Sequence, residues 1–119
     1  SFWYKPYNSD SPETEKTSFA NSLVIFIHVE EMDKGDMVDK AVGNIKWLAN
    51  KNKTNTVVLH SFAHLSNSKS DPETANVMIQ NISEKLKKNL SVHIVPFGQF
   101  YEFSIHVLGQ SLAKVFKNL

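Results

Sequence analysis

Apolar and polar residues alternate along this chain in the manner of strands separated by helices. Residues 22–30 are apolar on both alternating faces, which is typical of a strand covered on both sides. Residues 56–62 repeat this pattern and predict a second buried strand. Two stretches with apolar residues at helical spacing accompany these strands. Their predicted buried faces are Val38, Ala41, Val42, Ile45, Leu48 and Ala49 in the first helix, and Ala75, Met78, Ile79, Ile82 and Leu86 in the second.

Polar and turn-forming residues mark the ends of both helices. Residues 33–36 supply a turn and an N-cap for the first helix, which we expect to end near residues 50–52. Asp71 stands where it can cap the second helix, with Pro72 at the first helical position.

The N-terminal segment predicts another strand. Residues 2–7 are aromatic-rich, and Pro6 confines this strand to a sheet edge or to a strand end because proline cannot donate a backbone hydrogen bond. Residues 8–18 are polar and predict an exposed loop.

The C-terminal part predicts two strands and a short closing helix. Residues 91–95 and 100–107 have strand patterns, and Gly98 with Gln99 between them favours a hairpin-like connection. Residues 112–116 suggest the helix. Alternating strands and helices predict an α/β fold with a single mixed β-sheet and helices packed on it.

Composition narrows the class of protein. A chain of 119 residues with 41% hydrophobic residues has the length and apolar content of one domain, residues 1–119. The formal charge of +1 gives no overall argument for nucleic acid, so a basic patch would have to arise from local clustering. The chain has no cysteine, which fits a reducing cytoplasm, and no apolar stretch of the roughly 20 residues needed to span a bilayer. It begins with Ser1 instead of Met, so N-terminal sequence could have been removed.

Two segments at strand ends are candidates for chemistry. One is residues 61–66, which contains His64, and the other is residues 96–101. Ligands of open α/β sheets tend to bind beyond the carboxyl ends of strands. A histidine in such a place is nevertheless more often a hydrogen-bonded structural residue than a functional one.

Other chemistries find little support in the residues. His60 and His64 do not sit on a predicted helix, and no motif has metal-ligand spacing, so we expect no metal and no cofactor. Ser61 and Ser66 flank His64 without the glycine elbow of a serine hydrolase. A lysine cluster near the end of the second helix either complements the helix dipole or contacts RNA; its members are Lys85, Lys87 and Lys88.

Several segments together resemble the archaeal-type editing domain of threonyl-tRNA synthetase. In order and spacing they are residues 23–30, Phe-Ala-His-Leu-Ser at 62–66, Asp-Pro-Glu-Thr-Ala at 71–75, and Pro-Phe-Gly at 96–98 followed by Phe103, Ile105 and Gly109. The resemblance covers most of the chain from Ser22 onward. It implies a fold similar to D-aminoacyl-tRNA deacylase, a homodimer, and a pocket for the aminoacylated 3′ end of tRNA that hydrolyses a wrongly attached serine.

The resemblance also implies which residues form that pocket. His64 is the polar site residue retained, and Phe100 stands where the family has tyrosine. Carried over from the matching segments, the expected substrate-binding residues are Val29, Glu30, Phe62, Ala63, Ala75, Phe97, Gly98 and Phe100.

Two positions depart from the family pattern. Tyr101 stands where the family has a lysine that positions water and substrate, and Lys114 replaces an acidic residue. A neutral phenol with a reference pKa near 10 is a poor base at neutral pH. We hypothesise that Lys114 supplies the positive charge that Tyr101 lacks, which makes His64, Tyr101 and Lys114 the candidate catalytic residues. The family's first short strand also has no counterpart before residue 2.

Three functions are therefore open at the level of sequence. The first is a deacylase that acts on mischarged tRNA such as Ser-tRNA(Thr), freestanding or as part of a threonyl-tRNA synthetase. The second is a non-catalytic module that binds an aminoacyl-adenosine end or regulates a partner. The third is a purely structural dimer partner. The matching segment around His64 favours the first, and the substitutions at Tyr101 and Lys114 favour the second.

Overall fold

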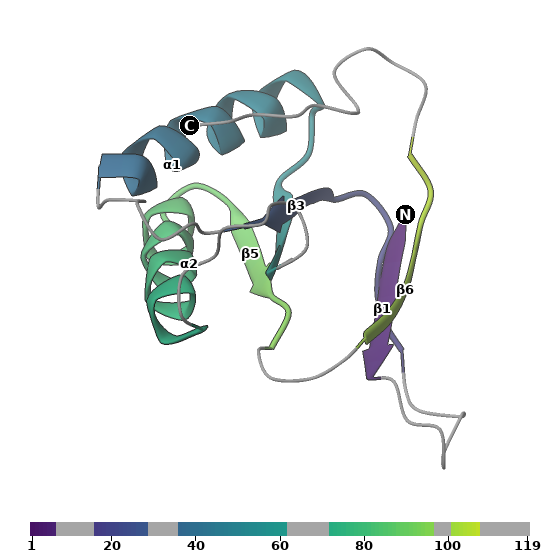
Figure 1. The fold of residues 1–119 in the computed structure, drawn as a ribbon. Coiled ribbons are helices and arrows are strands. Elements are labelled where there is room, and N and C mark those ends of the chain that lie inside the picture. Colours follow the sequence, from purple (N-terminus) through teal and green to yellow (C-terminus); the bar gives the residue numbers. More distant parts are fainter. Residues whose placement is uncertain (7–15, 29–35, 62–71, 97–100, 108–119) are drawn as a thin grey trace.

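The computed structural model of the chain describes residues 1–6, 16–28, 36–61, 72–96 and 101–107. These contain two helices and six strands (Figure 1). In chain order the elements are β1 (Phe2–Pro6), β2 (Thr17–Phe19), β3 (Leu23–Ile27), α1 (Asp36–Lys51), β4 (Thr56–Ser61), α2 (Pro72–Leu86), β5 (Ser91–Ile94) and β6 (Tyr101–Ile105).

One sheet is parallel and carries both helices on one face. Its strand order is β3-β4-β5, with Ile25 opposite Leu59 and Leu59 opposite Ile94. Each pair of neighbouring strands is joined through a helix, the connection that parallel strands require. Alternate residues of β3 point to opposite faces, so Leu23, Ile25 and Ile27 pack toward the helices.

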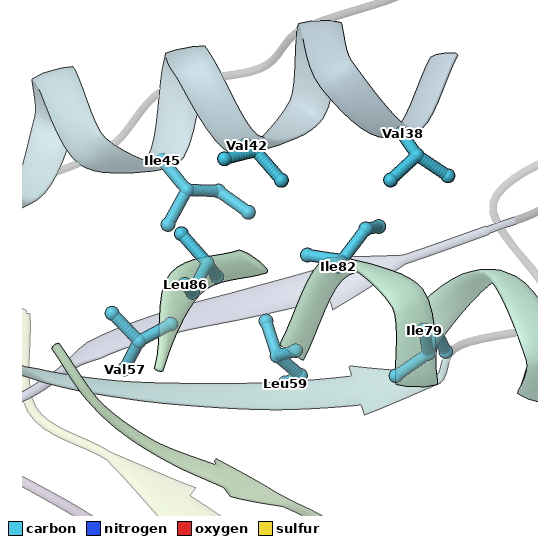
Figure 2. Close-up of a cluster of buried hydrophobic side chains, with 8 residues drawn as sticks. All are labelled: Val38, Val42, Ile45, Val57, Leu59, Ile79, Ile82 and Leu86. Atoms are coloured by element: carbon cyan, nitrogen blue, oxygen red, sulfur yellow. The ribbon is translucent and has the colours of Figure 1, made fainter. Parts of the chain in front are cut away.

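The main hydrophobic core lies between this sheet and the two helices. Figure 2 shows side chains from α1, α2 and β4 meeting in one cluster. Leu59 is fully buried, as the continuous apolar run of β4 predicts, and so is Ile79 on the apolar face of α2. The eight buried members are Val38, Val42, Ile45, Val57, Leu59, Ile79, Ile82 and Leu86.

A second, antiparallel sheet covers the other face of the parallel sheet. Its order is β2-β1-β6, with Phe2 opposite both Phe19 and Ile105. A smaller core fills the space between the sheets and includes the buried side chains of Phe2, Tyr4, Val58 and Val95. The described residues therefore form three layers, as Figure 1 shows. The two helices make the first layer, the parallel sheet the second and the antiparallel sheet the third.

The helices and central strands agree with the sequence. The α/β class is confirmed, as are both helices with their buried faces, and α1 ends at Lys51. Pro72 is the first residue of α2, and Pro6 is the last residue of β1, so the proline stands at a strand end as predicted. Among the described residues, neither helix is long and apolar enough to cross a membrane.

The sheet arrangement differs from the expectation in two respects. The described strands form two three-stranded sheets instead of a single mixed one. The prediction of a hairpin-like connection between residues 91–95 and 100–107 is wrong, because β5 pairs with β4 while β6 pairs with β1. Strand β2 also lies partly within the segment predicted as a loop. The predicted closing helix at 112–116 lies outside the described residues.

Candidate functional site

The carboxyl ends of the three parallel strands lie at one edge of their sheet. Ile27 at the end of β3 is opposite Ser61 at the end of β4, and the backbone amide of Val95 donates to the carbonyl of Leu59 at 2.9 Å. Because the strands are parallel, the candidate segments 61–66 and 96–101, and the candidate residues Val29 and Glu30, all come in the chain at or shortly after the strand ends at this edge.

Most of the predicted site residues lie in those segments or after residue 107, outside the described residues. They are His64 and Lys114 among the candidate catalytic residues, and Val29, Glu30, Phe62, Ala63, Phe97, Gly98 and Phe100 among the candidate binding residues. Two are described, Tyr101 and Ala75. Ala75 is buried in the first turn of α2, the helix that leads back from the carboxyl end of β4 to the start of β5.

Tyr101 lies at the start of β6 and ties the second candidate segment together. Its hydroxyl donates a hydrogen bond to the carbonyl oxygen of Pro96 at 2.6 Å. This contact joins the two residues that flank residues 97–100. The bond is exposed to solvent and is a local contact between Tyr101 and Pro96.

The ring of Tyr101 also reaches the end of β4. It meets the imidazole of His60 edge to face, with ring centroids 5.9 Å apart, and it meets Tyr4 in the same manner at 5.3 Å. Such perpendicular contacts are a favourable arrangement of aromatic rings. Since His60 is two residues before Phe62 in the chain, the flanks of the two candidate segments lie next to each other.

The electrostatic setting of Tyr101 opposes a role as a base. Burial, together with the neighbouring Tyr4, raises the pKa of the Tyr101 hydroxyl above its usual value. The phenol stays protonated at neutral pH, and its proton points at the Pro96 carbonyl. At this position the chain therefore offers neither a cation nor a proton acceptor of suitable strength.

His60 is a buried imidazole beneath this edge. Its Nδ1 lies 2.7 Å from the carbonyl oxygen of Ser61, and a carbonyl only accepts, so Nδ1 carries the proton. Burial lowers the pKa of His60, although the bond to Ser61 opposes that shift. His60 is neutral at pH 7 and holds the end of β4 in place. Among the described residues, no three His, Asp or Glu side chains gather as metal ligands would.

A second histidine links the two sheets. The Tyr4 hydroxyl and Nε2 of His93 are 2.6 Å apart, and the ring of Phe19 lies 5.0 Å from the His93 ring. Burial lowers the pKa of His93. His93 is not among the site residues predicted from the sequence. The available signal was its place in β5, since alternation puts it on the same face as Val95, toward the second sheet.

Comparison with known proteins identifies the family. The sequence model of the archaea-specific editing domain of threonyl-tRNA synthetase matches residues 1–119. The chain belongs to this family. The resemblance noted in the sequence is thereby confirmed.

Individual relatives of this editing domain include threonine–tRNA ligases and a threonine–tRNA ligase editing subunit. The chain is 36% identical over 109 residues to a threonine–tRNA ligase of Staphylothermus marinus, covering 90% of this chain and 18% of the relative. It is 32% identical over 99 residues to a threonine–tRNA ligase editing subunit of Saccharolobus solfataricus, covering 83% and 26%. A ligase of Thermococcus onnurineus is 32% identical over 113 residues, covering 92% and 18%. The chain therefore spans only 18% to 26% of the length of these relatives.

Proposed function

We propose that this editing domain hydrolyses the ester of a mischarged tRNA, with Ser-tRNA(Thr) as its substrate. The observation that carries the proposal is the match to the editing-domain family along the whole chain. The gathering of strand carboxyl ends at one edge is consistent with it, because the matching segments leave the sheet there. The reaction belongs in the cytoplasm, with or within a threonyl-tRNA synthetase.

The chemistry requires a placed water and a stabilised oxyanion. Water adds to the ester carbonyl carbon, the bond to the ribose oxygen breaks, and that oxygen leaves as a hydroxyl while serine leaves as its carboxylate with release of one proton. Groups that hold the water and donate to the oxyanion supply the rate enhancement. We assign these roles to His64 and Lys114. Tyr101 is assigned a positioning role through its bond to the Pro96 carbonyl.

Deacylation by the purified chain tests the proposal. Ser-tRNA(Thr) should lose its serine faster than Thr-tRNA(Thr) loses threonine, and D-aminoacyl-tRNA tests the related stereochemical activity. His64→Ala should lower the rate by about 100-fold or more, the scale of a lost general acid–base or positioning group. His106→Ala is the matched control, since His106 is exposed at the far end of β6. Equal rates with and without the protein would refute hydrolysis.

A binding module without turnover is the second candidate. It is favoured by the state of Tyr101, whose hydroxyl is protonated and committed to the Pro96 carbonyl at the place where the family has a lysine. Titration with a non-hydrolysable seryl-adenosine analogue separates the two functions. Binding combined with no release of serine from Ser-tRNA(Thr) would establish the module.

We also propose that the domain is a homodimer. Strand β6 is at the edge of the antiparallel sheet and exposes Phe103 and Ile105, at 37% and 40% of their surface, and Val107, two residues after the strand, is 39% exposed. Apolar side chains along an edge strand are a typical site of association. Sedimentation should give twice the chain mass, and Ile105→Lys should give the mass of one chain.

A further inference from the structure

The outward face of α1 and of the turn that follows it is basic. Residues 40–61 contain four lysines and neither aspartate nor glutamate. All four lysines are exposed. They are Lys40, Lys46, Lys51 and Lys53.

Trp47 lies exposed among these lysines. Its side chain leaves 48% of its surface to solvent, although tryptophan is highly buried on average. Lys51 Nζ stands 5.8 Å from the centre of the indole ring, within reach of a cation–π contact. Trp47 thus lies in a stretch of α1 whose exposed charges are lysines, and the exposed acidic residue Asp39, one position before Lys40, is paired with Lys85.

The end of α2 continues this surface. Figure 2 shows α1 and α2 side by side, with Ile45 of α1 close to Leu86 near the end of α2. The turns after the two helices touch, since the amide of Ser91 donates to the carbonyl of Asn55 at 2.8 Å. The turn after α2 adds two exposed lysines. We call this surface the basic face; it consists of Lys40, Lys46, Trp47, Lys51, Lys53, Lys87 and Lys88.

Complementarity to the helix dipoles explains only part of the basic face. Cations stabilise the last turn of a helix, which accounts for Lys51 and the residues after it. Lys40 and Lys46 lie in earlier turns of α1, and no dipole requires an exposed Trp47. Lys85 is paired with Asp39 across the two helices, and within the basic face Lys87 lies 3.9 Å from the carboxylate of Glu84, a solvent-exposed pair. The whole chain is nearly neutral at +1, so the basic face is a local segregation of charge.

We propose that the basic face binds the body of the tRNA, at a distance from the acylated end. Its lysines contact backbone phosphates and Trp47 stacks on an unpaired base, the combination by which proteins hold RNA without reading its sequence. An acidic protein would match the charge, but it would give no reason for an exposed indole. This inference rests on the proposed function for the identity of the RNA.

The end of the basic face formed by Lys51, Lys53, Lys87 and Lys88 suits a second contact on a large substrate. The turn after α1 leads into the amino end of β4, whereas the candidate site lies beyond the carboxyl end of that strand. The six residues of β4 span about 20 Å. A folded tRNA bridges this separation, and a single aminoacyl-nucleotide does not.

Binding of uncharged tRNA at 50 to 200 mM KCl tests the lysines. Each phosphate contact contributes about a 3- to 4-fold fall in affinity over this salt range. Lys46→Ala/Lys51→Ala should therefore lower the slope of log affinity against log salt by about 2. Lys5→Ala/Lys16→Ala removes the same charge from the antiparallel sheet and should leave the slope near that of the wild type. Equal slopes for the wild type and the α1 variant, or equal losses in both variants, would overturn the proposal.

The stacking of Trp47 on a base is tested separately from the lysines, because salt does not screen a stacking contact. Trp47→Ala should weaken tRNA binding at least about fivefold at every salt concentration, with an unchanged slope. Val77→Ala, on α2 and 52% exposed, is the matched control and should have no effect. Loss of poly-glutamate binding without loss of tRNA binding in the basic-face variants would assign the face to an acidic protein and refute RNA.

Comparing hydrolysis of a short ester with hydrolysis of the charged tRNA separates failure of this inference from failure of the proposed function. Basic-face variants should cleave 3′-seryl-adenosine at the wild-type rate and Ser-tRNA(Thr) more slowly at subsaturating concentration. If the wild type cleaves neither substrate, the proposed hydrolysis is refuted. The tRNA affinities of the wild type and the basic-face variants then still test whether the basic face binds RNA. A wild type without measurable tRNA binding at 50 mM KCl would exclude the basic face as an RNA contact.

Discussion

The hydrogen bond between Tyr4 and His93 is expected to hold the two sheets together. Tyr4 lies in β1 of the antiparallel sheet and is 5% exposed, and His93 lies in β5 of the parallel sheet. Their side chains meet at 2.6 Å in a partly buried place. Because burial lowers the pKa of His93, the imidazole is neutral at pH 7, and its tautomer decides whether Nε2 accepts the Tyr4 hydroxyl proton or donates its own.

Replacement of Tyr4 by phenylalanine isolates this bond. The ring remains and keeps its contacts with Phe2 and Tyr101, so no cavity forms. A net hydrogen bond contributes about 0.5–1.5 kcal/mol, and an acceptor left unpaired in a buried place costs about 1–3 kcal/mol. Since His93 is only partly buried, Tyr4→Phe should lower the free energy of unfolding by about 1–2 kcal/mol.

Urea denaturation of four proteins measures the bond itself. The set is the wild type, Tyr4→Phe, His93→Phe and the double variant, all at pH 7.5. The two single losses should fail to add by about 1 kcal/mol, because each removes the same bond. Additive losses, or a Tyr4→Phe protein as stable as the wild type, would show that the contact does not stabilise the sheet packing.

Three further outcomes are expected from the described residues. Leu59→Ala should cost about 2–5 kcal/mol of unfolding free energy in urea, because Leu59 is fully buried, whereas Val77→Ala at an exposed site should stay within about 0.5 kcal/mol; similar losses would contradict the placement of the core. The unfolding free energy should fall as the pH drops below about 6.5, by up to about 1.4 kcal/mol per pH unit for each of His60 and His93, because their pKa values are lowered in the folded state and the unfolded state therefore binds more protons. The fall should level off below the folded-state pKa values. Unfolding measured from pH 7.5 to 5 on the wild type, His60→Gln and His93→Gln tests this, and a flat wild-type profile would refute it. Tyr101→Phe should lower the melting temperature by the equivalent of about 1 kcal/mol or less, since the hydroxyl bond to Pro96 is exposed to solvent; a loss of several kcal/mol would mean that this bond secures more than the loop ends.

Local pattern was sufficient for the helices and the central strands. The apolar residues of α1 and α2 recur every three or four positions, and Pro72 fits only the first turn, so each helix is specified within its own segment. The apolar runs of β3 and β4 likewise predict strands that are covered on both faces. The family resemblance also came from the sequence, because it depends on motifs and their spacing.

Strand partners were decided by the tertiary structure. Phe2 of β1 pairs with Ile105 of β6, more than one hundred positions away, and no local pattern encodes such a pairing. The Gly98 and Gln99 signal for a hairpin carried no information on the sheet to which the next strand would return. Pairing depends on which faces can bury Phe2 and Tyr4 together, and that requires both sheets to be present.

The candidate site was likewise predicted in part from the sequence and in part established only by the tertiary structure. The sequence alone supplied the residue types and their order, above all the segment around His64 and the unusual Tyr101. Only the folded chain brings Tyr101 against His60 and directs its hydroxyl to the Pro96 carbonyl. The physical reason is that side-chain chemistry is local information, whereas the pKa and the partner of a side chain depend on burial by residues distant in the sequence.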